Sequence, residues 1–114
     1  MTRYKVVLVP FPFDDLSSSK VRPAVCLTEP IGLHRQVILA FITSKIPGEL
    51  LKTDVSIVSD DDDFEMTGLR VSSTLRLHRM MTVTSNIIQR ELGQLSEEKR
   101  EIVQKKLKLL FDLG

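Results

Sequence analysis

The chain has 114 residues, of which 42% are apolar and 27% are charged, and its formal net charge is +1. This length predicts a single domain over residues 1–114. No apolar run approaches the roughly 20 residues that a membrane helix needs, and we find no signal-peptide pattern, so we expect a cytoplasmic protein with no membrane partner. One cysteine and two separated histidines form no plausible metal set, so neither a metal nor a cofactor is predicted.

The acidic residues are unevenly distributed. Asp60–Asp63 and Glu65 hold five of the fifteen acids, so the rest of the chain carries 16 − 10 = +6. This predicts a positive surface elsewhere that could bind phosphate, although a net charge of +1 does not by itself predict a nucleic-acid partner. Successive side chains on an extended chain point in alternate directions, so we interpret the acidic run as a solvated loop and not as a metal site.

The predicted elements are short strands followed by one helix. Apolar runs and period-two alternation, separated by proline, glycine and polar turns, predict strands over residues 2–9, 21–28, 35–43, 52–58, 68–83 and 87–92. Prolines at positions 10 and 12 should end the first strand or keep it at an edge. This order favours a mainly β (α+β) fold, a small antiparallel sheet or partly open barrel of five to seven strands.

The last predicted element is an amphipathic helix. Ser96 is a good N-cap, and Glu97 and Glu98 fall in the first turn, where the helix dipole favours acids. Apolar residues at helical spacing form a stripe at positions 102, 103, 107, 110 and 111. We expect this helix to close the open side of the sheet with its basic residues facing solvent.

The candidate functional residues lie at the ends of predicted strands. Arg22 stands where a polar loop enters a strand, and Pro23 holds it in extended geometry. It is either surface decoration or an anion-binding group, and the local sequence leaves both open. Thr43 and Ser44 place two hydroxyls at the end of another strand. Further along, Arg76 and His78 share the polar face of a half-buried strand.

The run VVLVPFPFDDLSSSKVRPAVCL, Val6 to Leu27, resembles the N-terminal signature of the MazF/PemK toxin family. The likeness continues in order through Ala40–Ser44, Thr67–Leu77 and Gly93–Ser96. It implies an SH3-like, MazF-type barrel with a C-terminal helix, usually a homodimer. It also implies the toxin of a type II toxin–antitoxin system: a metal-independent endoribonuclease, or mRNA interferase, that cuts single-stranded RNA and is blocked by a cognate antitoxin.

The family's catalytic pair maps onto Arg22 and Thr43. RNA carries its own nucleophile, the 2′-OH, so a guanidinium that stabilises the developing charge and an alcohol that fixes the geometry are chemically sufficient. Cleavage would leave a 2′,3′-cyclic phosphate or its hydrolysis product. The residues that we expect to support catalysis or bind RNA are Ser44, Lys20, Ser19, Lys45, Arg76 and His78.

Two departures from the family pattern bear on activity. Tyr4 and Lys5 stand where the family usually has Gly-Asp, and His78 stands where an acid is common. The alternative is therefore a non-catalytic member of the same fold, which acts by protein binding as a gyrase-poison-like protein or by sequestering an antitoxin. That alternative leaves the Arg22-Pro23 and Ile42-Thr43-Ser44 motifs unexplained.

Overall fold

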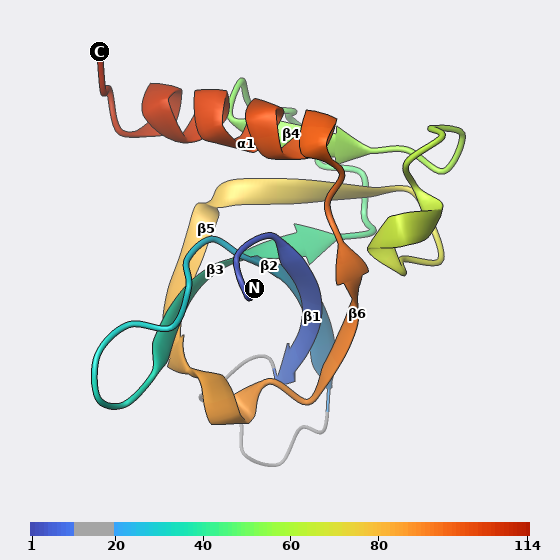
Figure 1. Cartoon of the computed structure of the whole chain (residues 1–114). Helices are drawn as coiled ribbons and strands as arrows, with labels where there is room; N and C mark the ends of the chain where they lie inside the picture. Colours follow the sequence, from blue (N-terminus) through green and yellow to red (C-terminus); the bar gives the residue numbers. More distant parts are fainter. Residues whose placement is uncertain (11–19) are drawn as a thin grey trace.

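The computed structural model describes residues 1–10 and 20–114 of the chain. Within these residues six strands form one antiparallel sheet in the order β4-β5-β3-β2-β1-β6. The strands are β1 (Lys5–Pro10), β2 (Val21–Cys26), β3 (Gln36–Thr43), β4 (Asp54–Ile57), β5 (Ser73–Thr84) and β6 (Arg90–Gln94). The sheet curls into a half-barrel, and helix α1 (Glu97–Leu110) lies across one end of it (Figure 1). The predicted mainly β barrel with a C-terminal helix is confirmed.

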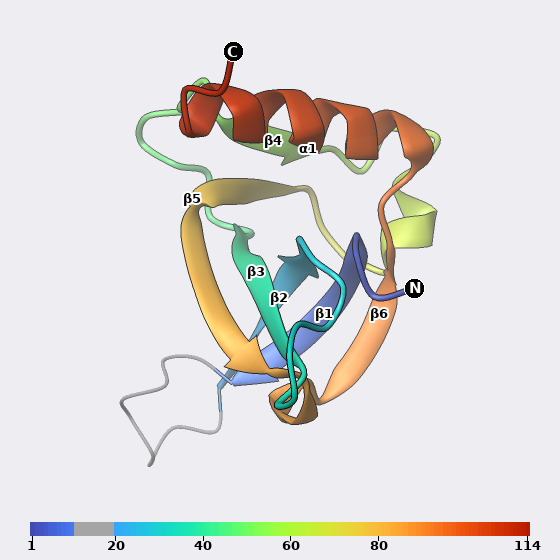
Figure 2. The same ribbon diagram turned by 60° about the vertical axis from the view of Figure 1, so that its left-hand side comes forward.

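The longest described strand, β5, connects the edge strand β4 to β3 and the rest of the sheet. Its first residues pair with β4, with Leu75 opposite Val55, and its last residues pair with β3, with Val83 opposite Val37. Figure 2 shows β5 passing beneath α1 and then turning down beside β3. The sequence predicted that this strand would begin at residue 68, which is wrong, because it begins at Ser73 and the exposed Val71 precedes it.

The buried apolar side chains that the structure describes gather in two clusters on opposite faces of the sheet. The cluster beneath α1 includes Val6 of β1, Val25 of β2 and Val103 of the helix. The other includes Val7 and Ala24 from the same two strands. Strands buried on both faces read as continuous apolar runs in the sequence. This is why β1, β2 and β3 were predictable from sequence.

Helix α1 begins against the acidic loop. Ser96 Oγ accepts a hydrogen bond from Lys99 N at 3.1 Å, as an N-cap does, and donates one to Asp63 Oδ2. Lys99 is buried, and its Nζ lies 3.2 Å from Asp61 Oδ2 and 3.8 Å from Asp63 Oδ2. The acidic loop is therefore not simply solvated, and Lys99 does not face solvent as expected. No helix in the described residues is long and apolar enough to cross a membrane.

Tyr4 occupies the position where the family pattern led us to expect glycine. Its φ of 72° lies in the left-handed region that glycine favours. The ring is buried, with the guanidinium carbons of Arg3 and Arg100 at 4.8 and 5.3 Å from its centroid. Gln104 Nε2 donates a hydrogen bond to the Tyr4 hydroxyl at 2.8 Å. These contacts tie the start of β1 to α1 and hold the tyrosine in a backbone conformation that is otherwise unfavourable.

Two glycines allow the segment around the 3₁₀ turn η1 (Glu65–Thr67) to lie directly against β6. A Cβ at Gly68 would lie 2.1 Å from Leu92 O, and a Cβ at Gly93 would lie 2.2 Å from Met66 O. Gly68 also has a φ of 73° and ends the turn in the left-handed conformation. The two backbones can approach this closely only because neither position carries a side chain.

Replacing Gly93 with alanine should lower the free energy of unfolding by about 2 kcal/mol or more, because the methyl group meets backbone atoms that cannot move aside. Urea denaturation followed by circular dichroism measures this. Gly48→Ala is the matched control, since a Cβ there meets no described atom within 4 Å. Equal stability of the two variants would contradict the close packing of η1 on β6.

Candidate active site

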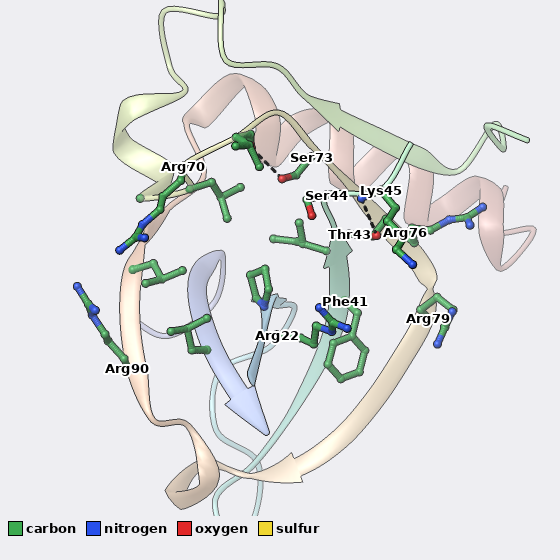
Figure 3. Close-up of a pocket in the computed structure, with 17 residues that line it drawn as sticks. Arg22, Phe41, Thr43, Ser44, Lys45, Arg70, Ser73, Arg76, Arg79 and Arg90 are labelled. Carbon is green, nitrogen blue, oxygen red and sulfur yellow. Dashed lines mark hydrogen bonds between the residues drawn. The ribbon is translucent and has the colours of Figure 1, made fainter. Parts of the chain in front are cut away.

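A cavity of about 570 Å³ opens between the strands and the segment that precedes β5 (Figure 3). Its volume lies within the roughly 300–1,000 Å³ typical of ligand sites. The described residues that line it are Leu8, Arg22, Pro23, Phe41, Ile42, Thr43, Ser44, Lys45, Gly68, Leu69, Arg70, Val71, Ser73, Arg76, Arg79, Arg90 and Leu92. Side chains from β2, from β3 and from the strands on either side of them therefore line one opening.

Arg22 and Thr43 both line this cavity. Ala24 of β2 pairs with Phe41 of β3 in antiparallel register. Continuing that register by two residues on each strand sets Arg22 opposite Thr43, and opposite residues of an antiparallel pair point to the same face. Arg22 is exposed at the start of β2, and Pro23 follows it on the cavity lining. The sheet thus brings together the two residues that the sequence placed far apart.

The end of β3 presents two hydroxyls and a cation to the cavity. Thr43 Oγ1 accepts a hydrogen bond from Lys45 N at 3.1 Å, which fixes the threonine side chain against the turn. A hydroxyl that accepts one bond can still donate its proton to another group. Ser44 and Lys45 are exposed and also line the cavity.

Arg76 lines the cavity, and the carboxylate of Asp54 holds its guanidinium in place. Its Nε and Nη2 each lie 3.2 Å from a carboxylate oxygen of Asp54, whose side chain has no exposed surface. Asp54 Oδ2 also accepts a hydrogen bond from Leu51 N at 2.9 Å. This bidentate pair fixes the orientation of Arg76 and compensates part of its charge.

The remaining predicted site residues lie elsewhere. His78 is not among the described residues of the cavity lining, and its Nδ1 lies 4.0 Å from Asp54 Oδ1. Lys20 is exposed but is likewise absent from that lining. Ser19 lies outside the residues that the structure describes.

Sequence reasoning missed three arginines of the cavity. Arg70 precedes β5, Arg79 lies on β5 and Arg90 begins β6. They bring the number of cationic residues in the described lining to six, and that lining contains no aspartate or glutamate. The excess of +6 outside the acidic loop was the only signal for this concentration of charge, and it did not say where the charge would gather. A concave surface with cations and no described carboxylate attracts an anionic ligand.

Nearly the whole chain, residues 2–111, matches the model of a protein family described as "PemK-like, MazF-like toxin of type II toxin-antitoxin system". The chain belongs to this toxin family. The match extends from the residues before β1 to the end of α1, so the sheet, the cavity and the helix all fall within it. The family resemblance predicted from sequence is confirmed.

Solved structures share the fold of this toxin-family chain. An endoribonuclease in complex with its cognate antitoxin, from a mycobacterial species, superposes with a TM-score of 0.72 at 13% identity, covering 100% of this chain and 97% of that one. The Mycobacterium tuberculosis toxin MazF-mt6 gives 0.70 at 22% identity, with coverage of 96% and 98%. A second mycobacterial endoribonuclease gives 0.70 at 12% identity, with coverage of 100% and 93%. No curated protein sequence matches the chain.

Other reactive groups of this toxin-family chain do not contribute to the cavity. Cys26 is fully buried, and burial is the main cause that raises the pKa of its thiol to about 11. The thiol is therefore protonated at neutral pH and is not a nucleophile. In residues 1–10 and 20–114, no group of three or more His, Cys, Asp or Glu side chains could hold a metal ion.

Proposed function

We propose that this toxin-family chain is an endoribonuclease that cleaves single-stranded RNA in the cavity between β2, β3, β5 and β6. The observation that carries the proposal is the composition of the cavity: six cations, with no carboxylate among the described lining residues, around Arg22 and Thr43. The shared fold of solved endoribonucleases supports it. A purely protein-binding role leaves the placement of Arg22 and Thr43 in one cavity unexplained.

The proposed reaction uses the nucleophile that RNA itself carries. The 2′-OH gives up its proton to solvent as its oxygen attacks the adjacent phosphorus. A new P–O2′ bond forms, the P–O5′ bond breaks, and the departing 5′-oxygen takes a proton from solvent. The products are a 2′,3′-cyclic phosphate and a 5′-hydroxyl. The protein must hold the 2′-OH in line with the leaving oxygen and stabilise the extra charge on the phosphorane.

Arg22 and Thr43 are suited to these two tasks. A guanidinium such as that of Arg22 stays charged in proteins, and its planar fork can bind two phosphate oxygens. It therefore acts first by electrostatic stabilisation and is a poor proton shuttle. The Thr43 hydroxyl, fixed by its bond to Lys45 N, can donate to a phosphate oxygen or contact the 2′-OH.

Supporting roles follow from the placement of the neighbouring residues. Lys45 and Arg76 add positive charge at the same wall of the cavity, and Ser44 adds a hydroxyl. Because Asp54 holds Arg76 in one orientation, its charge is preorganised and needs no rearrangement when RNA binds. Lys20 and His78 are outside the described lining, so any contact they make would be with RNA beyond the cavity, and Ser19 lies outside the residues that the structure describes.

The proposed partners follow from family membership. A type II toxin implies a cognate antitoxin protein, and a cavity with six cations suits an acidic segment of such a partner. We also propose a homodimer, as in the family, acting on RNA in the cytoplasm. Size-exclusion chromatography with light scattering measures the oligomeric state directly.

The purified protein should cut a long, unstructured RNA in the presence of EDTA and should leave DNA of the same sequence intact, because DNA lacks the 2′-OH. Primer extension locates the cut sites, and end-group analysis should find 5′-hydroxyl and 2′,3′-cyclic phosphate termini. Failure of the wild-type protein to cut RNA in EDTA would end the proposal. Inhibition of DNA gyrase without RNA cleavage would instead favour the protein-binding alternative.

A further inference from the structure

Arg70 and Arg90 approach the cavity from parts of the chain that carry none of the proposed catalytic groups. Figure 3 shows both on the side of the cavity away from Thr43, Lys45 and Arg76. Both side chains are exposed, and neither forms a hydrogen bond or ion pair with a described residue. Two unpaired guanidinium groups at a concave surface are available to bind an anion.

The backbone around Gly68 packs directly against the backbone around Gly93, and this contact holds Arg70 and Arg90 on the same side of the cavity. Arg70 lies two residues after Gly68, and Arg90 lies three residues before Gly93. Since the backbones of these segments pack at distances that no side chain would permit, the two arginines are mounted on one rigid unit. Their proximity is therefore built into the fold and does not depend on flexible loops.

The turn that carries Arg70 is also braced internally. Thr67 is buried, its Oγ1 donates to Phe64 O at 2.6 Å, and it accepts from Leu69 N at 3.2 Å. These bonds fix the residue immediately before Arg70. A side chain on such a braced backbone loses less conformational freedom on binding than one on a flexible loop.

We propose that Arg70 and Arg90 form a phosphate-binding wall that holds a phosphate of the RNA strand other than the one being cleaved. This inference rests on the proposed function. A single strand presents one phosphate per nucleotide, so a strand that crosses the cavity from Arg22 toward β6 brings a second phosphate to this wall. In the proposed function the scissile phosphate lies against Arg22 and Thr43, which both line the cavity, and the wall lies across the cavity from Thr43 (Figure 3).

The two arginines are positioning residues in this scheme. They contact RNA in the ground state and the transition state alike, so their loss should weaken binding without slowing the chemical step. Arg22 differs, because its contact strengthens as charge develops on the reacting phosphate. The expected signature of the wall is a raised KM with an unchanged kcat.

The test is the double variant Arg70→Gln/Arg90→Gln. The probe is a fluorescent single strand of randomised sequence with 2′-fluoro riboses, which retains every phosphate and cannot be cleaved. We expect affinity to fall about tenfold or more, and the slope of log K against log salt to shrink by about 0.7 for each phosphate that the variant no longer neutralises. With RNA substrate, KM should rise by a similar factor while kcat stays within about twofold.

Lys105→Gln/Lys108→Gln is the matched control. These two exposed cations lie on α1, outside the described cavity lining, and their removal changes the net charge by the same amount. This variant should bind the probe with nearly the wild-type affinity and salt slope. If both double variants lose the same affinity, the effect is one of net charge, and the wall is refuted.

The remaining outcomes separate this inference from the proposed function. Wild-type protein that cuts RNA, with an Arg70→Gln/Arg90→Gln variant of unchanged KM and salt slope, overturns the wall alone. A loss of kcat at unchanged KM also overturns it. Wild-type protein that binds the probe through these arginines but never cuts RNA supports the wall and refutes the nuclease.

Discussion

Replacing Arg22 with alanine should lower kcat for RNA cleavage by about 10²–10³, the usual cost of removing one group that stabilises charge in the transition state. Arg22 is exposed and forms no ion pair with a described residue, so the free energy of unfolding should change little. Arg22→Lys should recover only part of the rate, because lysine keeps the charge but loses the planar fork. Single-turnover cleavage of RNA in EDTA measures the chemical step.

Lys105→Ala controls for the loss of one positive charge. It lies on α1 away from the described cavity lining, so cleavage should stay near the wild-type rate. Thr43→Val preserves the shape of the side chain, removes the hydroxyl and should also lower kcat. If Arg22→Ala cuts RNA as fast as the active Lys105→Ala control does, Arg22 has no part in the mechanism.

The fold was largely predictable because its signals are local. Runs such as Val6–Val9 and Val37–Ala40 are buried on both faces, and their ends carry proline, glycine or polar turns. The N-cap at Ser96 also depends on neighbours in the chain. The start of β5 was misjudged because Val71 continues the alternation on sequence but follows the left-handed turn at Gly68, which ends the preceding segment.

The candidate site was only partly predictable because its charge is assembled across the sheet. Arg22 and Thr43 were found by the family resemblance, and strand register explains why they meet. Arg70, Arg79 and Arg90 come from separate segments with no shared motif, and a net charge of +1 conceals them. The offsetting acids are partly committed elsewhere, since acidic-loop carboxylates bind Lys99 at the start of α1.

Asp54 is a buried charged residue whose structural role the local sequence does not reveal. It occupies an alternating stretch typical of a strand, yet its carboxylate is buried and accepts bonds from Leu51 N and from two nitrogens of Arg76. Its backbone carbonyl accepts a bond from Lys106 Nζ of α1. The edge strand β4, its neighbour β5 and the helix therefore meet at one charged residue.

Replacing Asp54 with alanine should lower the free energy of unfolding by about 3 kcal/mol or more, since it leaves Arg76, whose side chain is only 22% exposed, without its charge partner and the Leu51 N–H without its acceptor. Urea denaturation measures the loss. The exposed Asp60→Ala should stay within about 0.5 kcal/mol of wild type. Removing both partners of the ion pair, in Asp54→Ala/Arg76→Met, should lower the free energy of unfolding by less than the sum of the single changes, because no buried charge is then left unpaired. Additive effects in that cycle would show that the bidentate pair does not organise this side of the cavity, and that Arg76 is held there by packing alone.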